Sequence, residues 1–242
     1  MTLLTVENMS KNFSGLKAVT DLSLTVEEGQ ICGLIGPNGA GKTTTFNLIT
    51  GFLPVSAGKI FFDKTEITGL ESHKICDIGL TRTFQHAQPF RGLSVHDNVL
   101  TGSFLRNKKR KDAEKITDDA LDMVKMYEKR NKLTKDLTIG ETKRLEIARA
   151  LATGPKMLLL DEVMAGLTLV EVDEIIQLIF ELRDSRGITF MLIEHVMRAV
   201  MSLSDKVVVL QHGVKIAEGT PAEVAANEKV IEAYLGEDEN IA

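Results

Sequence analysis

Residues 36–44 constrain the fold of this chain more than any other segment. They read Gly-Pro-Asn-Gly-Ala-Gly-Lys-Thr-Thr and fit the phosphate-binding pattern G-x-x-x-x-G-K-[ST]. The apolar run at residues 31–35 predicts a buried strand before this loop, and residues 43–49 predict a helix after it. A strand, a glycine-rich loop and a helix in this order indicate the start of an α/β core that binds a nucleoside triphosphate.

Each residue type in this phosphate loop (residues 36–44) has a physical role. Glycines let the backbone wrap around a phosphate without a Cβ in the way, and the loop N–H groups and the helix N-terminus present positive charge to it. Lys42 can reach the β- and γ-phosphates, and the Thr43 hydroxyl can ligate magnesium. The predicted binding residues are Gly36, Pro37, Asn38, Gly39, Ala40, Gly41, Lys42, Thr43 and Thr44.

Composition and charge exclude several classes of protein. Hydrophobic residues make up 43% of the 242 residues, which is enough for a full-sized buried core. The formal net charge of −5 gives no overall attraction to nucleic acid, so no nucleic-acid partner is expected. No apolar run approaches the roughly 20 residues that span a bilayer, and no secretory signal opens the chain. The two distant cysteines, Cys32 and Cys76, favour a reducing compartment over a disulfide framework.

The remaining pattern predicts an α/β core interrupted by helices. Residues 3–28 contain two strand-like runs of alternating apolar residues, and residues 94–151 carry apolar residues at helical spacing. Helices are predicted at residues 97–105 and 116–127, with Thr117 as a cap near the start of the second. Further strands are predicted at residues 60–62, 157–161, 188–193, 206–210 and 214–217, and a helix at residues 170–184.

Strands that alternate with helices favour a mostly parallel sheet covered on both faces. The predicted fold class is therefore α/β: a P-loop NTPase core with an N-terminal antiparallel β element and an inserted helical subdomain. We expect a single domain over residues 1–242, with the core at residues 1–93 and 152–242 and the helical subdomain at about residues 94–151. The basic run at residues 106–111 is either a solvated connection between helices or a contact for anionic lipid headgroups.

Two adjacent carboxylates follow the apolar run at residues 157–160. In parallel α/β sheets, ligands bind at the carboxyl ends of the strands. Asp161 is therefore placed to hold magnesium through its water shell, and Glu162 can polarise an attacking water. Together with the phosphate loop, this pair predicts hydrolysis of the bound triphosphate.

With both motifs in place, the chain resembles the ATP-binding subunit of an ABC transporter over essentially its whole length. The resemblance includes a glutamine loop at Gln85, a signature segment at residues 137–141 and a late histidine, His195. Among ABC proteins, the chain is most similar to the ATP-binding subunits of branched-chain amino acid importers. The segments that carry this similarity are residues 82–86, 90–98, 144–152, 193–195 and 234–237.

The resemblance implies a role for each matched residue. The implied catalytic residues are Glu162, His195 and Gln85, and the implied magnesium ligands are Thr43, Gln85 and Asp161. Phe13 matches the aromatic residue that stacks on adenine, with a core position as the alternative, and Val19 is a candidate for the same base pocket. The remaining histidines show no metal-ligand spacing and are expected to be structural: His73, His86, His96 and His212.

The family further implies an ATPase, with ATP and Mg²⁺ as cofactors, that powers the uptake of branched-chain amino acids or a related small solute. Two such subunits close head to tail around ATP, so the expected partners are a second ABC ATPase subunit, identical or different, and two integral membrane permeases. A solute-binding protein would act indirectly, and the chain would lie peripherally at the cytoplasmic face of the membrane. The alternatives are a lipopolysaccharide-export ATPase and a non-transport ABC ATPase, such as one in iron–sulfur cluster assembly.

The signature segment departs from the usual L-S-G-G-Q of the family. It reads Leu-Thr-Ile-Gly-Glu, and its implied nucleotide contacts are Thr138, Ile139, Gly140 and Glu141. Thr138 keeps a hydroxyl and Gly140 keeps a close backbone approach, whereas the β-branched Ile139 restricts the backbone. Glu141 adds a negative charge that is expected to oppose phosphate binding at close range.

Two further departures follow the catalytic glutamate. Val163 stands where the family has a proline, and Thr168 stands where an aspartate ties the two subunits together. Lys42, Asp161 and Glu162 are intact. The sequence therefore supports nucleotide binding more strongly than it supports rapid hydrolysis.

Overall fold

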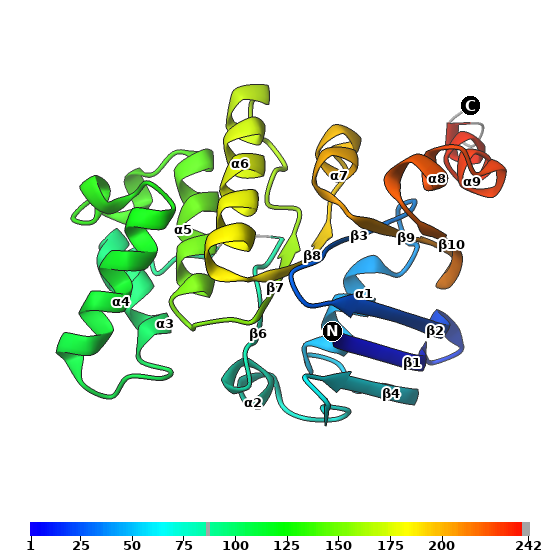
Figure 1. Ribbon diagram of the computed structural model, residues 1–242, viewed down its shortest axis with the longest axis horizontal. Coiled ribbons are helices and arrows are strands. Elements are labelled where there is room, and N and C mark those ends of the chain that lie inside the picture. The colour runs from blue at the N-terminus through cyan, green and yellow to red at the C-terminus, as the bar shows by residue number, and fades with distance from the viewer. Residues whose placement is uncertain (86–87, 239–242) are drawn as a thin grey trace. The chain divides into compact units, whose positions relative to one another are not determined.

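The computed structural model describes residues 1–85 and 88–238, which divide into two compact units (Figure 1). Unit 1 comprises Met1–Ile75 and Thr189–Ala242, and unit 2 comprises Cys76–Ile188. Helix α2 (Ser72–Asp77) spans the boundary between them. The helical segment expected at residues 94–151 falls inside unit 2.

The first sheet of unit 1 is the antiparallel element that the alternating pattern predicts. Its strands are β1 (Thr2–Phe13), β2 (Leu16–Glu27), β4 (Ala57–Phe62) and β5 (Thr65–Glu66), in the order β2-β1-β4-β5. In this register Val6 pairs with Leu24 on one side and with Ile60 on the other. All three side chains are buried, because alternation along each strand places its apolar residues on one face.

The second sheet of unit 1 carries the phosphate loop. Strand β3 (Ile31–Ile35) pairs in parallel with β8 (Thr189–Ile193) and with β9 (Lys206–Gln211), while β10 (Val214–Gly219) is antiparallel to β9. Every residue of β3 and β8 is buried, as the continuous apolar runs predict for parallel strands. The helices of unit 1 are α1 (Lys42–Ile49), α7 (Met197–Leu203), α8 (Pro221–Ala225) and α9 (Glu228–Asp238).

Unit 2 is mainly helical, with one short parallel pair of strands, β6 (Leu80–Arg82) and β7 (Met157–Asp161). Its helices are α3 (Val95–Ser103), α4 (Arg110–Met123), α5 (Ile139–Leu151) and α6 (Leu169–Arg186), with short 3-10 turns at Tyr127–Lys129 and Thr134–Asp136. Strand β6 has no counterpart in the sequence prediction, because three residues are too few to show a period.

The predicted start of α4 was wrong. The helix begins at Arg110 and not at Ile116, so Thr117 lies within it and does not cap it. The Thr117 hydroxyl is buried, donates to the Ala113 carbonyl at 2.9 Å and shares a hydrogen bond with Ser103 at 2.8 Å. The prediction from apolar spacing left out the first turn of α4, because that turn consists mainly of charged residues. The basic run at residues 106–111 therefore forms both the α3–α4 connection and the first residues of α4.

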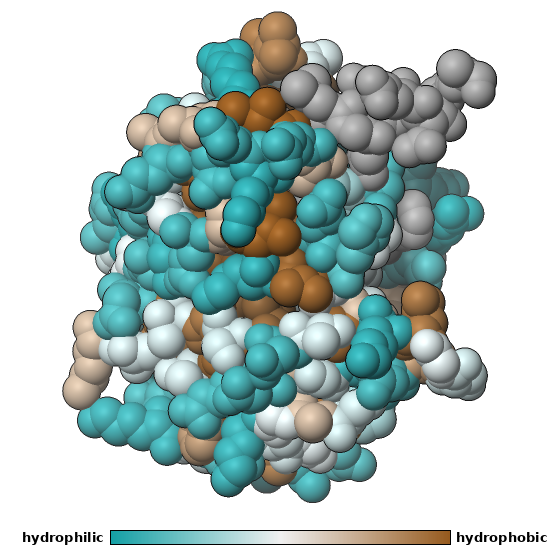
Figure 2. All heavy atoms as spheres, turned by 90° about the vertical axis from the view of Figure 1, so that its right-hand side faces the viewer, coloured by the Kyte–Doolittle hydropathy of each residue, from teal (hydrophilic) through white to brown (hydrophobic). Residues whose placement is uncertain are grey.

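Hydrophilic side chains cover most of the face that Figure 2 shows, and hydrophobic atoms reach it mainly in a central strip. Most of the apolar residues of β1–β4, β8 and β9 in unit 1, and of β7 in unit 2, are buried. Within residues 1–85 and 88–238, no helix is both long enough and apolar enough to cross a bilayer.

Candidate functional site

The phosphate loop follows the carboxyl end of β3 and has the backbone that only glycine permits. Gly36, Gly39 and Gly41 have φ values of 147°, 74° and 99°, all in the left-handed half of conformational space. A Cβ on Gly36 would lie 2.0 Å from the carbonyl oxygen of Leu210, and one on Gly41 would lie 2.5 Å from that of Ala18. The glycines are therefore required by close backbone packing as well as by the turn.

Lys42 is buried at the end of this loop. Its ammonium group donates to the carbonyl oxygens of Gly36 at 2.6 Å and Pro37 at 2.9 Å, so the side chain folds over the loop. Helix α1 begins at Lys42 without a side-chain cap, which leaves the N–H groups of its first turn directed at the loop. Thr43, the predicted magnesium ligand of this turn, is exposed. A cationic group and N–H donors around a glycine turn are groups that can bind a phosphate.

Three other predicted residues belong to unit 1. His195 follows β8, which is the parallel neighbour of β3, so His195 and the phosphate loop follow the carboxyl ends of adjacent strands. Phe13 ends β1 with 40% of its surface exposed and with the Lys11 ammonium 5.0 Å from its ring, so it is not a core residue. Val19 lies against the loop, 3.5 Å from where a Cβ on Gly41 would be, but is fully buried.

In unit 2, Asp161 ends β7 in a buried ion pair that the sequence did not reveal. One carboxylate oxygen, Oδ2, accepts a hydrogen bond from the Arg82 guanidinium at 2.8 Å, and both side chains are almost fully buried. Burial raises the pKa of Asp161, whereas the Arg82 charge acts in the opposite direction. The other oxygen, Oδ1, is buried and has no hydrogen-bond partner in the part of the chain described. Carboxylate oxygens are preferred ligands of magnesium, so Asp161 fits its predicted role.

Glu162 occupies a strained backbone position one residue later. Its φ of 51° lies in the left-handed region, which is unusual for a residue with a side chain. Its carboxylate accepts a hydrogen bond from the side-chain amide of Gln85 at 2.9 Å. The two residues predicted to act on the attacking water and on magnesium are therefore in direct contact.

A cavity of about 510 Å³ in unit 2 brings this pair together with the signature segment. It is lined by Gln85, Leu137, Ile139, Thr142, Lys143, Glu162, Ala165 and Gly166. Ile139 is 62% exposed and is the first residue of α5, where a β-branched residue is sterically acceptable. The backbone restriction expected from the β-branched Ile139 is therefore compatible with the helical conformation that this residue adopts.

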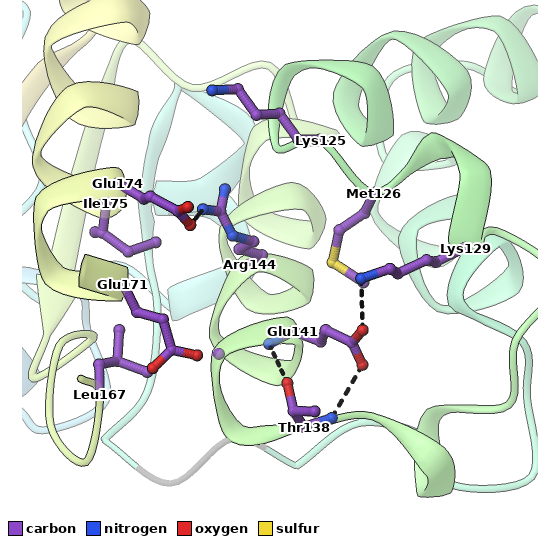
Figure 3. A pocket seen from close by; sticks show the side chains of 11 residues that line it. Lys125, Met126, Lys129, Thr138, Glu141, Arg144, Leu167, Glu171, Glu174 and Ile175 are labelled. Carbon is purple, nitrogen blue, oxygen red and sulfur yellow. Dashed lines mark hydrogen bonds and ion pairs between the residues drawn. The ribbon is translucent and has the colours of Figure 1, made fainter. Parts of the chain in front are cut away.

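The signature segment forms the N-terminus of α5 (Figure 3). Thr138 is the N-cap, and its hydroxyl oxygen accepts from the Glu141 N–H at 3.2 Å while Glu141 Oε2 accepts from the Thr138 N–H at 3.0 Å. This reciprocal capping box fixes the first turn. Thr138, Ile139, Gly140 and Glu141 thus present a helix N-terminus, which favours an anion.

The negative charge of Glu141 is compensated within the chain, contrary to the expected repulsion of phosphate. Its two carboxylate oxygens pair with the ammonium groups of Lys129 at 2.6 Å and Lys132 at 2.9 Å. Hydrogen bonds from these lysines and from the Thr138 backbone outweigh burial and lower the pKa of Glu141 to about 2. A carboxylate paired with two cations contributes little net repulsion.

Glu171 on α6 packs against the same segment in the 340 Å³ pocket of Figure 3. Its carboxylate accepts from the Thr168 N–H at 2.9 Å, and the Thr168 hydroxyl oxygen accepts from the Glu171 N–H at 3.3 Å, so Thr168 caps α6. A Cβ on Gly140 would lie 2.5 Å from Glu171 Oε1, so a larger residue there would require the flexible Glu171 side chain to move. Thr168 is therefore engaged within its own chain, and Val163 is fully buried in the core.

Sequence reasoning missed three polar residues at the site. Arg82 pairs with Asp161, Glu171 contacts the signature segment, and Lys143 donates to the Glu162 carbonyl oxygen at 2.9 Å. Each is made significant by a partner distant in sequence. The one usable signal was the S/T-x-x-E spacing of a capping box, which both Thr138–Glu141 and Thr168–Glu171 satisfy.

The structure assembles the predicted residues in two groups. Unit 1 holds the phosphate loop, Phe13, Val19 and His195. Unit 2 holds Gln85, Asp161, Glu162 and the signature segment. His86 lies outside the described residues.

Besides Asp161, the carboxyl of Glu146 on α5 is buried, and it makes the free energy of unfolding depend on pH. Burial raises the pKa of Glu146 from 4.5 to about 7, although Lys143 and Arg149 act in the opposite direction. Its Oε2 has no hydrogen-bond partner among residues 1–85 and 88–238. Because the folded-state pKa exceeds the unfolded one, the stability conferred by the neutral carboxyl is present below pH 4.5 and is lost as the pH rises through 7.

We therefore expect Glu146→Gln to raise the free energy of unfolding at pH 8, by of the order of 1–2 kcal/mol, and to raise it less at pH 5. Denaturant unfolding at both pH values measures this difference. Glu181→Gln, at an exposed position on α6, is the matched control. An equal response of the two variants to pH would show that Glu146 is not the buried carboxyl responsible.

Comparison with known proteins shows which family of proteins this chain resembles. A family model described as "ABC transporter" matches residues 19–165, and one described as "Branched-chain amino acid ATP-binding cassette transporter" matches residues 214–240. The first covers the phosphate loop, the carboxylates and the signature segment. The second covers β10 and the C-terminal helices.

Individual relatives match the chain over almost its entire length. The high-affinity branched-chain amino acid transport ATP-binding protein BraF of Pseudomonas aeruginosa is 40% identical, with 97% of this chain and 98% of BraF covered. The lipopolysaccharide export system ATP-binding protein LptB of Escherichia coli is 39% identical, with 98% and 99% covered. A solved nucleotide-free ATP-binding cassette from an ABC transporter has a TM-score of 0.88 and 33% identity, with 97% and 99% covered.

Proposed function

The chain belongs to the ABC transporter family, and we propose that it is the MgATP-hydrolysing subunit of an importer for branched-chain amino acids or a related small solute. Membership of the family makes it an ATP-binding cassette ATPase that powers transport. The observation that carries the hydrolytic part of the proposal is the contact between Gln85 and Glu162, which follows β7 in a left-handed conformation.

The phosphate loop binds the triphosphate. Lys42 is held close to the loop by two carbonyl oxygens, from which its ammonium can transfer to the β- and γ-phosphates. Phe13 is exposed enough to stack on adenine. The first turn of α1 adds N–H donors and the positive end of a helix dipole.

Thr43, Gln85 and Asp161 would hold magnesium, which supplies neutralisation of the charge that develops on the phosphates. Asp161 Oδ1, which has no hydrogen-bond partner among the described residues, supports this assignment. Glu162 orients and polarises the attacking water, and His195 contacts the γ-phosphate and that water. The amide nitrogen of Gln85 donates to Glu162, and the amide oxygen is the atom that would ligate magnesium.

A second ABC ATPase subunit completes the site by placing its signature segment on the bound nucleotide. This chain offers the N-terminus of α5 for the same purpose, with the charge of Glu141 compensated by two lysines. We propose that two membrane permeases bind this pair at the cytoplasmic face of the membrane, with a solute-binding protein delivering the substrate.

The similarity to BraF and the match of residues 214–240 to the branched-chain amino acid model favour import. Lipopolysaccharide export is the second candidate, because LptB is nearly as similar to this chain as BraF is. The two relatives differ in substrate, branched-chain amino acids for BraF and lipopolysaccharide for LptB, and both are ATP-binding proteins.

Uptake of radiolabelled leucine, isoleucine and valine by cells that lack this chain tests the proposal. We expect uptake to fall, to return with the wild-type chain and to stay low with Glu162→Gln. Normal uptake together with a defect in lipopolysaccharide delivery would instead support the exporter.

A further inference from the structure

Lys143 links the signature helix to the catalytic end of β7. It lies on α5, two residues after the signature segment, and is only 7% exposed. Its ammonium donates to the main-chain carbonyl oxygen of Glu162 at 2.9 Å and lies 3.5 Å from that of Gln85. Lys143 therefore contacts the main chain of both Glu162 and Gln85, whose side chains are hydrogen-bonded to each other.

A buried ammonium is costly unless it is partnered, so its position is set by the groups that satisfy it. Among the described residues, the groups within hydrogen-bond distance of the Lys143 ammonium are main-chain carbonyls, which carry partial charge, while the Glu146 and Asp161 carboxyl groups act on it electrostatically without forming an ion pair. The contact therefore orients the two peptide groups more than it forms an ion pair. Of the two contacts, the one to Glu162 has the shorter, stronger geometry.

The contact acts at a backbone position that needs support. Glu162 has a φ of 51°, and a residue with a side chain remains in this region only when surrounding structure holds it there. A donor on the Glu162 carbonyl oxygen fixes the peptide plane that follows Glu162. The conformation at Glu162 in turn determines where its carboxylate points, which is toward the Gln85 amide.

We propose that Lys143 is a positioning residue for hydrolysis: it holds the Glu162 backbone in its left-handed conformation and keeps Glu162 and Gln85 aligned with the signature helix α5. This inference rests on the proposed ATPase function. It deepens that function by connecting the segment that binds the partner subunit's nucleotide to the carboxylate that acts on this subunit's own nucleotide. Lys143 touches neither nucleotide in this role.

The test compares a variant that removes the positive charge of Lys143 with one that keeps it. Lys143→Met keeps the length and apolar stem of the side chain but loses the donor, whereas Lys143→Arg keeps a cationic donor. We expect Lys143→Met, assayed as the full chain with its membrane partners, to lower kcat for ATP by about tenfold or more with KM and the Kd for ATP nearly unchanged. Lys143→Arg should retain most of the wild-type kcat.

Lys206→Met is the matched control. Lys206 is also a mostly buried lysine that donates to a main-chain carbonyl, that of Thr25 at 2.5 Å, but it lies in unit 1. Its replacement should affect thermal stability without lowering kcat. A loss of kcat in Lys206→Met equal to that in Lys143→Met would show a general effect of removing such a lysine and would overturn the proposal.

Two other results would also overturn it: a wild-type kcat in Lys143→Met, or a loss in Lys143→Arg as large as in Lys143→Met. If Lys143→Met does not fold, Lys143→Leu, which also lacks a donor, takes its place in the same comparison. An inactive wild-type complex would instead count against the proposed function, so the two failures are distinguishable.

Discussion

Glu162→Gln is expected to reduce steady-state ATP hydrolysis by about 100-fold or more while leaving the affinity for ATP close to that of the wild type. Glutamine has nearly the same shape as glutamate but cannot polarise the attacking water as a carboxylate does. It can still occupy the left-handed position of residue 162 and accept from the Gln85 amide through its carbonyl oxygen. The loss should therefore appear in kcat and not in nucleotide binding.

Release of inorganic phosphate and calorimetric binding of ATP, measured on the same preparations, check both parts of this expectation. Glu174→Gln is a suitable control, because Glu174 is an exposed carboxylate of α6 that pairs with Arg144 away from Glu162. Hydrolysis by Glu162→Gln within a few-fold of the wild-type rate would show that another group activates the water.

Lys42→Ala is expected to abolish measurable ATP binding, a loss of about 100-fold or more in affinity. The substitution removes the cation that serves the β- and γ-phosphates. It also leaves the carbonyl oxygens of Gly36 and Pro37 without their donor, at the point where the loop must turn around the anion. Both consequences act on binding, so the effect should be seen before any catalytic step.

Isothermal titration of ATP into the variant measures this loss. Lys215→Ala serves as the control, since Lys215 also belongs to unit 1 and donates to the carbonyl of Ser23 at 2.7 Å outside the loop. Wild-type affinity in Lys42→Ala would contradict the role given to Lys42.

The sequence was most informative where function depends on residues close together in the chain. The phosphate loop is one continuous segment, and its strand, turn and helix appear where the spacing of Gly36, Gly41 and Lys42 predicts them. Asp161 likewise ends the continuous apolar run of β7. In both cases the local pattern contains all the information needed, because the backbone itself builds the site.

The sequence was least informative where a side chain is defined by a distant partner. The pairing of Arg82 with Asp161, 79 residues later, depends on the tertiary fold. The same is true of Lys143 and Glu162, and of Lys129 and Glu141, whose ion pair compensates the negative charge in the signature segment. Spacing reveals none of these contacts, because partner choice follows from packing.

The central claim is that ATP is shared between two ATPase subunits. Light scattering of Glu162→Gln, with and without saturating MgATP, tests it most directly, because slow hydrolysis should preserve the ATP-bound state. We expect the mass of one chain without nucleotide and twice that mass with MgATP. A mass of one chain at saturating MgATP, with ATP binding confirmed by calorimetry, would contradict the shared site.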